Sequence, residues 1–288
     1  MPGALRCPAG KETVHVVVTG AAGFIGSNIV RALNARGITE ILAVDDLSSG
    51  DKARNLVGLR IADYVDKGEF YDRFALGSFG RVEAVLHDGA CTDTSAVAAS
   101  EVMRDNYSLS CRLLDACHLH DARLIYASAA AVYGNEPGAD PGHEQPLDLY
   151  GYSKLLFDGR VRRECGPSFT RNGAQVVGLR YFSVYGPGES HKGRMRSIVS
   201  NAIEQCAAGE RVTLWAPETG APAPTRDLVH VDDVVAVNLW FLDHPARSGI
   251  FDVGTGRAIR LDQVAAVVQA SVRAAASQES DASELEHV

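Results

Sequence analysis

The chain has 288 residues, of which 46% are hydrophobic and 22% charged, and its formal net charge is −8. This composition indicates a soluble globular protein whose core fills one large domain or two unequal ones. The negative charge gives no electrostatic support for binding nucleic acid or an anionic membrane. No apolar run approaches the roughly 18 residues that a membrane-spanning helix needs.

The cysteines and the first residues indicate a cytoplasmic protein. The six cysteines are scattered, without a Cys-x-x-Cys pair or the Cys/His spacing of a metal site. We therefore expect reduced thiols in the cytoplasm and no metal centre. Residues 1–12 contain no apolar segment of the kind found in secretory signal peptides.

A short strand followed by three glycines begins the predicted fold. Residues 14–19 are mostly β-branched, which predicts a buried parallel strand. Gly20, Gly23 and Gly26 come next, and apolar residues at helical spacing follow them. Such glycines allow a tight turn in which backbone N–H groups and a helix N-terminus bind a pyrophosphate. This segment therefore predicts a dinucleotide site.

The second predicted strand, residues 41–44, ends at two carboxylates. Asp45 and Asp46 stand about twenty residues past the glycines, where an acidic side chain can bind the ribose 2′-hydroxyl of NAD. Lys52 and Arg54 follow closely and could instead bind the 2′-phosphate of NADP. At this point the residues leave NAD and NADP both open.

Strands and helices alternate through the next part of the chain. We expect strands at residues 84–87, 123–127 and 175–180, and helices at residues 101–120 and 150–165. A turn of small residues, 88–92, follows the first of these strands. The alternation predicts an α/β fold, a doubly wound parallel sheet of the Rossmann type that binds ligands at the carboxyl ends of its strands.

Beyond residue 181 the pattern changes. We expect a turn at 184–187, a loop at 217–224, helices at 231–242 and 261–276, a strand at 249–253 and an acidic tail at 281–288. A basic patch consists of Lys192, Arg194 and Arg196. The expected division is a dinucleotide-binding domain over 12–182 and a smaller, discontinuous substrate domain over 183–288, with residues 228–256 returning to the first domain.

Tyr150 and Lys154 are a candidate proton-transfer pair. If a helix begins here, the two side chains lie one turn apart on one face. An ammonium close to a phenol favours the phenolate, so Lys154 should lower the pKa of Tyr150 from its usual value of about 10. Such a phenol can exchange a proton with a substrate hydroxyl. Alone, this spacing is typical of an ordinary helix, but the glycine turn in the same chain favours a catalytic role.

Several segments together carry a family resemblance. The chain resembles the extended short-chain dehydrogenases/reductases of the NAD-dependent epimerase/dehydratase family through Gly20-x-x-Gly23-x-x-Gly26, Tyr150-x-x-x-Lys154 and Arg180-Tyr-Phe-Ser-Val-Tyr-Gly-Pro187. Within that family it is most similar to the ADP-heptose 6-epimerases of lipopolysaccharide core biosynthesis, through His191-Lys-Gly193 and Arg226-Asp227 among other segments. The resemblance runs from Val16 to about Leu261.

The resemblance implies an isomerase that inverts C6 of ADP-glycero-manno-heptose through a transient 6-keto sugar. A bound NADP, with NAD as the alternative, would remove hydride from C6 and return it to the other face. Tyr150 and Lys192 would transfer protons, one on each face, and Lys154 would bind the nicotinamide ribose. The family also implies a homo-oligomer, a pentamer, acting on a nucleotide sugar.

The resemblance assigns binding positions as well. Its cofactor positions are Gly20, Gly23, Phe24, Ile25, Gly26, Asp45, Asp46, Lys52, Lys67, Asp88, Gly89, Ala90, Cys91, Thr92, Asn106, Tyr150, Lys154 and Val184. Its substrate positions are Ser128, Ser183, Lys192, Arg194, Asn201, Trp215 and Arg226.

Some positions depart from the family's pattern. Ala129 stands where the family has a Ser or Thr that bonds the reacting oxygen, and one step along a strand turns Ser128 to the opposite side. Ser183 replaces an asparagine and Arg194 replaces a small serine. The family pattern also continues past the end of this chain, so we expect a truncated substrate domain and impaired turnover.

Two alternative functions stay open on these residues. One is another NAD(P)-dependent nucleotide-sugar epimerase or dehydratase, in which Ser183 and Arg194 alter the specificity. The other is a pseudoenzyme that binds the cofactor without catalysis, which Ala129 favours.

Overall fold

A computed structural model describes residues 15–48, 50–93, 97–134, 142–171, 173–213 and 224–285, with side chains up to residue 275. Its main sheet contains seven strands in the order β10-β7-β5-β4-β1-β2-β3, all paired in parallel. The strands are β1 (His15–Thr19), β2 (Ile41–Asp45), β3 (Asp63–Asp66), β4 (Val82–His87), β5 (Arg123–Ala129), β7 (Ala174–Tyr181) and β10 (Gly249–Val253). A short strand, β6 (Thr170–Arg171), adds to β7 in the antiparallel direction. The predicted doubly wound parallel sheet is therefore confirmed.

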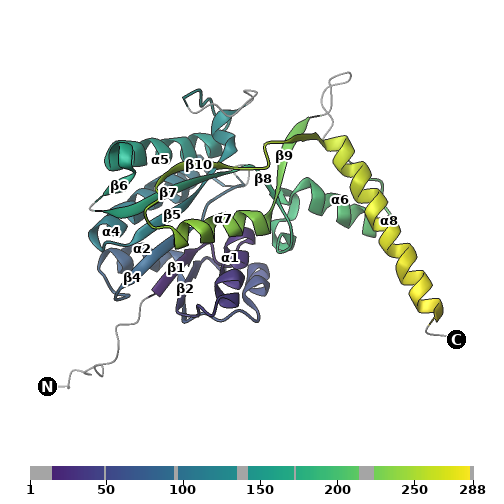
Figure 1. Cartoon of the computed structure of the whole chain (residues 1–288), viewed down its shortest axis with the longest axis horizontal. Coiled ribbons are helices and arrows are strands. Elements are labelled where there is room, and N and C mark those ends of the chain that lie inside the picture. Colours follow the sequence, from purple (N-terminus) through teal and green to yellow (C-terminus); the bar gives the residue numbers. More distant parts are fainter. Residues whose placement is uncertain are drawn as a thin grey trace.

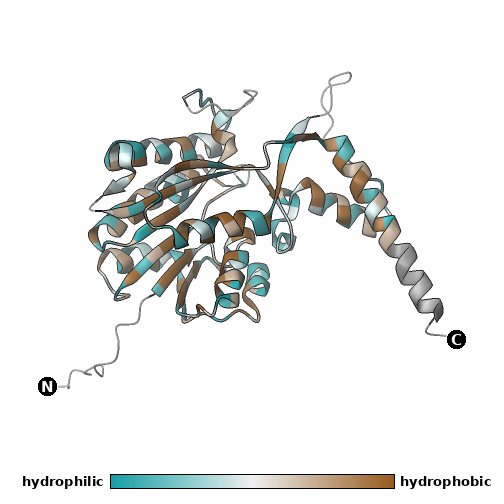
Figure 2. Cartoon of the chain, viewed as in Figure 1, coloured by the Kyte–Doolittle hydropathy of each residue, from teal (hydrophilic) through white to brown (hydrophobic). Residues whose placement is uncertain are grey.

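Helices cover both faces of this sheet (Figure 1). One core joins the sheet to α1 (Phe24–Ala35) and α7 (Val231–Asp243), and the other joins it to α2 (Lys67–Ala75), α4 (Leu109–Leu119) and α5 (Leu149–Cys165). A short helix, α3 (Ala99–Met103), continues through the π-helical residues Arg104–Ser108 into α4. Figure 2 shows hydrophobic residues concentrated along the central strands, as expected for a sheet buried on both faces.

A smaller unit follows β7. Its three strands, β8 (Ser183–Tyr185), β9 (Thr225–His230) and β11 (Ala258–Arg260), form a second sheet in the order β11-β9-β8. The helices α6 (Ile198–Ala207) and α8 (Leu261–Leu285) pack together through Ala202, Val264 and Val268. Figure 1 shows α8 extending away from the main sheet. Among the described helices, none is both long and apolar enough to cross a membrane.

The sequence missed some elements and misplaced others. It did not predict β3, because β3 buries a single residue and so has no apolar run, and it also missed α2, which follows β3 directly. The turn expected at 184–187 is wrong in its first part, since β8 pairs there with β9. The helix expected to end at residue 276 continues to Leu285, replacing much of the predicted tail, because alanine-rich sequence favours helix. The loop predicted at 217–224 lies almost entirely outside the described residues.

Candidate active site

The glycine turn packs its backbone where side chains would not fit. Gly20 has φ +68°, and a Cβ atom there would lie 2.8 Å from the backbone nitrogen of Gly89. A Cβ atom at Gly26 would lie 2.1 Å from the carbonyl oxygen of Gly20. The turn therefore requires glycine at both positions, and it places Gly20 against the backbone of Gly89, just after β4.

A cavity of about 700 Å³ opens beside this turn. It collects most of the predicted cofactor positions, namely Gly20, Gly23, Phe24, Ile25, Gly26, Asp45, Asp46, Lys52, Lys67, Asp88, Gly89, Ala90, Cys91 and Thr92, together with Lys192. Sequence reasoning missed several other lining residues, among them Thr19, Tyr71, Asp93, Asp105, His191 and Met195. Of these, His191 stands in the segment that carries the resemblance and could have been found. Tyr150, Lys154, Asn106 and Val184 are outside the lining of this cavity.

Asn106 does not line the cavity itself but binds the backbone of Cys91, which does. Its side-chain oxygen accepts a hydrogen bond from the N–H of Cys91 at 2.7 Å, and its Nδ2 donates to the carbonyl of Cys91 at 2.9 Å and to Oγ of Ser153 at 3.1 Å. The amide thus fixes the 88–92 turn against α5. Its own side chain is buried.

Two ion-paired clusters occupy the end of β2. Asp45 accepts hydrogen bonds from the N–H of Ala22 at 2.8 Å and from Nζ of Lys52 at 2.9 Å. Lys67 lies 3.3 Å from Asp46 and 3.1 Å from Asp105. Hydrogen bonds from Ser48, aided by Lys67, lower the pKa of Asp46 to about 2. Because each carboxylate already has a lysine partner, the two aspartates do not by themselves exclude a 2′-phosphate.

The Tyr150–Lys154 pair lies at the start of α5, where the side chain of Asp148 caps the helix through the N–H of Gly151. The Nζ atom of Lys154 lies 5.8 Å from the ring centroid of Tyr150 and donates to the carbonyl of Ala127 at 2.8 Å. Burial, with the negative charges of Asp148 and Asp88, raises the pKa of Tyr150 to about 12. The expected lowering is therefore wrong for this structure. Burial also lowers the pKa of Lys154 to about 8, which weakens the ammonium that was to stabilise the phenolate.

The carboxyl group of Asp88, which the sequence assigned only to the cofactor, also interacts electrostatically with Tyr150 and Lys154. Asp88 lines the cavity, and burial raises its pKa to about 7, against the charge of Lys154. The hydroxyl of Tyr181 donates to Asp88 at 3.3 Å, and Nδ2 of Asn238 donates to that hydroxyl at 2.8 Å. Both residues stand in segments that carry the family resemblance, but the sequence assigned neither of them a role, because both act through another residue.

The strand β5 ends at Ala129, the position where the resemblance predicts a hydroxyl side chain. Ser128 is 1% exposed, and its Oγ donates to Oδ2 of Asp158 at 3.1 Å. Asp158 also accepts from the hydroxyl of Tyr126 at 3.0 Å and from Nε of Arg180 at 2.9 Å. The assignment of Ser128 to the substrate is therefore corrected, since its side chain is held within the core. At the neighbouring position, Ala129 offers a methyl group.

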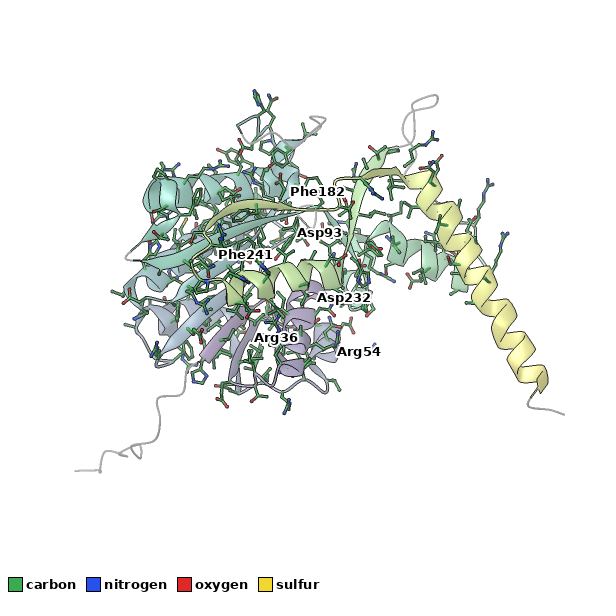
Figure 3. The ribbon with its side chains drawn as sticks, viewed as in Figure 1. Arg36, Arg54, Asp93, Phe182, Asp232 and Phe241 are labelled. Atoms are coloured by element: carbon green, nitrogen blue, oxygen red, sulfur yellow. The ribbon has the colours of Figure 1, made fainter. Side chains whose placement is uncertain are left out.

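The remaining predicted substrate residues are dispersed. Nζ of Lys192 lies 5.3 Å from the ring centroid of Phe24, and burial lowers the pKa of Lys192. Arg194 binds Asp93 through Nη2 at 2.9 and 3.0 Å (Asp93 is labelled in Figure 3). Among the others, Ser183 lies in β8, Asn201 donates to the carbonyl of Arg196, and Arg226 is exposed. Trp215 lies outside the described residues.

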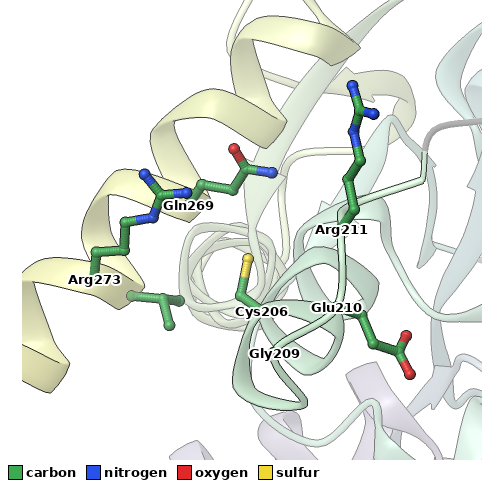
Figure 4. A pocket seen from close by; sticks show the side chains of 7 residues that line it. Cys206, Gly209, Glu210, Arg211, Gln269 and Arg273 are labelled. Carbon is green, nitrogen blue, oxygen red and sulfur yellow. The ribbon is translucent and has the colours of Figure 1, made fainter.

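A second cavity, of about 480 Å³, lies between α6 and α8 (Figure 4). It is lined by Cys206, Gly209, Glu210, Arg211, Gln269, Val272 and Arg273. None of the predicted site residues is among them, so this cavity is separate from the dinucleotide site. Within the described residues, no cluster of His, Cys, Asp and Glu could hold a metal ion.

Comparison with known proteins identifies the family. The sequence pattern of the NAD dependent epimerase/dehydratase family matches residues 16–254. This chain belongs to that family. It is 51% identical over 269 residues to the ADP-L-glycero-D-manno-heptose-6-epimerase of Pseudomonas paraeruginosa. This alignment covers 92% of this chain and 80% of that protein. It is 52% identical over 265 residues to the enzyme of the same name from Cupriavidus pinatubonensis, covering 90% and 78% respectively.

Solved structures of epimerases share the fold. The ADP-L-glycero-D-manno-heptose-6-epimerase of Helicobacter pylori is 26% identical, with a TM-score of 0.75 over 91% of this chain and 83% of that one. The UDP-glucose 4-epimerase of Thermotoga maritima is 28% identical, with a TM-score of 0.75 over 88% and 81%. The predicted resemblance to heptose 6-epimerases of the NAD-dependent epimerase/dehydratase family is therefore confirmed, as is a nicotinamide cofactor for the family.

Proposed function

We propose that this chain is an ADP-L-glycero-D-manno-heptose 6-epimerase, an isomerase of lipopolysaccharide core biosynthesis. The observation that carries the proposal is the identity of about half of the residues to epimerases of that name across nine-tenths of the chain. The dinucleotide cavity beside the glycine turn supports the reaction type. An epimerisation at C6 needs hydride removed from one face of that carbon and returned to the other.

The residues of the cavity fit a dinucleotide. Gly20, Gly23 and Gly26 line the cavity at the start of α1, where the helix N-terminus favours a pyrophosphate. When bound, the nicotinamide supplies the hydride acceptor, and its positive charge in the oxidised form favours the phenolate of a nearby tyrosine. We propose NADP rather than NAD, because Lys52 already pairs with Asp45 and can turn toward a 2′-phosphate.

The protein's own groups handle protons at O6 of the sugar. Tyr150 exchanges a proton with this oxygen on one face and Lys192 does so on the other, since one base cannot reach both. Lys154 binds the nicotinamide ribose and is held by the carbonyl of Ala127. Burial lowers the pKa of Lys192, which suits an amine that must give up and regain a proton.

Other proposed features follow from the resemblance. Ser183, Arg194, Asn201, Trp215 and Arg226 belong to the substrate side, on a smaller domain that begins near residue 183. The protein is a cytoplasmic homo-oligomer, a pentamer as in the family.

A specific observation favours a second candidate, a cofactor-binding protein without turnover. The methyl group of Ala129 cannot donate a hydrogen bond to the reacting oxygen, and the hydroxyl of Ser128 is committed to Asp158. A third candidate is a 4-epimerase of another nucleotide sugar, because the fold matches a UDP-glucose 4-epimerase with the same TM-score as the heptose enzyme.

The deciding experiment offers the purified protein two substrates in D₂O, ADP-D-glycero-D-manno-heptose and UDP-glucose. NMR of the products then reports which sugar is inverted. We expect the heptose to be inverted at C6 with its C6 hydrogen retained, because the hydride returns within the site. Inversion of UDP-glucose alone would favour the 4-epimerase. If a protein that binds NADP inverts neither sugar, the non-catalytic candidate is preferred.

A further inference from the structure

Residues 187–195 form one wall of the dinucleotide cavity. His191, Lys192 and Met195 of this segment line the cavity. At its first end the segment is tied to the nucleotide-binding unit. Asn28 donates to the carbonyl of Pro187 at 2.9 Å. Asn55 contacts the carbonyl of Gly188 at 3.2 Å and Nδ1 of His191 at 3.1 Å.

The other end of the segment is tied across the cavity. Nη2 of Arg194 lies 2.9 and 3.0 Å from the two carboxylate oxygens of Asp93, and its Nε lies 3.3 Å from the second of them. Asp93 follows the 88–92 turn at the end of β4 and lines the same cavity. Segment 187–195 therefore crosses from the side of Asn55 to the loop after β4, with Lys192 between its two attachments.

We propose that the Arg194–Asp93 ion pair holds segment 187–195 across this cavity and so sets the rate at which a bound dinucleotide leaves. Arg194 is then a positioning residue, which stands on the substrate side and holds segment 187–195 through its contact with Asp93. This inference rests on the proposed function, because slow release of the dinucleotide is useful only in an epimerase. An enzyme that takes hydride from a sugar and returns it to the same sugar regenerates its cofactor in place, so slow release costs it nothing.

The size of the effect follows from the exposure of the pair. The side chain of Arg194 is 66% exposed and that of Asp93 is 31% exposed. Ion pairs in such positions contribute little energy, so breaking this one should speed release by about two- to five-fold. Salt screens exposed charges, so high ionic strength should produce the same acceleration in the unaltered protein.

The test measures NADPH release from the full chain by stopped flow, mixing the fluorescent complex with excess NADP. The variants are Arg194→Ala, Asp93→Ala and the charge swap Asp93→Arg with Arg194→Asp. The matched control is Arg36→Ala, because Arg36 makes a similar two-pronged contact with Asp243 (3.1 and 2.8 Å) away from the cavity (Arg36 is labelled in Figure 3).

We expect both single variants to release NADPH about two- to five-fold faster, the swap to restore slow release, and Arg36→Ala to match the unaltered protein. If Arg194 acted through contacts other than Asp93, the swap would not restore slow release. Unchanged release in Arg194→Ala, or equal acceleration in Arg36→Ala, overturns the proposal. If the unaltered protein binds no NADPH, the proposed function and this inference both fail. If release is slow but unchanged by Arg194→Ala, this inference is overturned and the proposed function stands.

Discussion

The ammonium of Lys52 lies 2.9 Å from the carboxylate of Asp45, at the end of β2 where the ribose of a dinucleotide is expected. Lys52 therefore neutralises the charge that would otherwise repel a 2′-phosphate. Because of this ion pair, the site can accept NADP although two aspartates, Asp45 and Asp46, stand at the end of β2.

Replacing Lys52 by alanine should weaken NADP binding at least about ten-fold, the equivalent of 1.4 kcal/mol, and NAD binding much less. The variant leaves Asp45 without its cation and removes a partner for the phosphate. Titration calorimetry with each cofactor measures the difference. Arg54→Ala serves as control, because Arg54 lies in the same 3₁₀ helix, Gly50–Leu56, but does not line the cavity although the sequence offered it as a phosphate partner. Equal losses for NAD and NADP would show that Lys52 does not read the phosphate.

Gly26→Ala should abolish dinucleotide binding, because the new methyl group would lie 2.1 Å from the carbonyl oxygen of Gly20 and force the turn apart. Thermal shift with added NADP measures the loss. Gly50→Ala is the matched control, since a Cβ atom there meets nothing within 4 Å. Binding that survives in Gly26→Ala would place the dinucleotide elsewhere.

Lys192→Met should leave NADP binding intact and slow epimerisation by roughly 10²- to 10⁴-fold, the usual effect of losing an acid or base. Methionine keeps the contact with Phe24 while removing the amine. Single-turnover measurements on ADP-heptose report the chemical step. Full activity in this variant would remove Lys192 from the mechanism.

Asp88→Asn should change how stability depends on pH. The pKa of Asp88 in the folded protein, about 7, is above its ordinary 3.8, so its contribution is complete below the unfolded pKa and is lost as pH rises through about 7. Lys154 acts in a different window. Its folded pKa of about 8 is below the ordinary 10.5, so its contribution recovers as pH rises from 8 toward 10.5.

Urea unfolding at pH 5 and pH 7.5 tests the Asp88 contribution. Between these two values the asparagine variant should lose less stability than the unaltered protein, by about 1 kcal/mol or more. An identical loss in both proteins would mean that Asp88 titrates in its ordinary range.

Ala129→Ser should raise turnover about ten-fold or more without changing cofactor affinity, because a hydroxyl there can bond the reacting oxygen. Ser128→Ala should act on stability instead, costing about 1–3 kcal/mol by leaving Asp158 short of a donor. Kinetics and urea unfolding of both variants separate the two effects. A loss of turnover in Ser128→Ala at unchanged stability would contradict this division of roles.

The sequence alone determined the parts that local chemistry specifies. Glycines at 20, 23 and 26 after a β-branched strand predict the phosphate turn, because such a turn tolerates nothing larger. Alternating strands and helices predict the parallel sheet, and the four-residue spacing of Tyr150 and Lys154 predicts that one helix carries both. Each of these inferences needs only neighbours along the chain.

The tertiary structure decided what depends on groups distant in sequence. The pKa of Tyr150 is raised rather than lowered because burial, Asp148 and Asp88 all favour the neutral phenol, and Asp88 is brought in by a different strand. Ser128 belongs to the core because Asp158 of α5 accepts its hydrogen bond. Arg194 reaches Asp93 across 101 positions of sequence. Spacing along the chain cannot reveal these relationships, because desolvation and charge pairing depend on which side chains the folded sheet brings together.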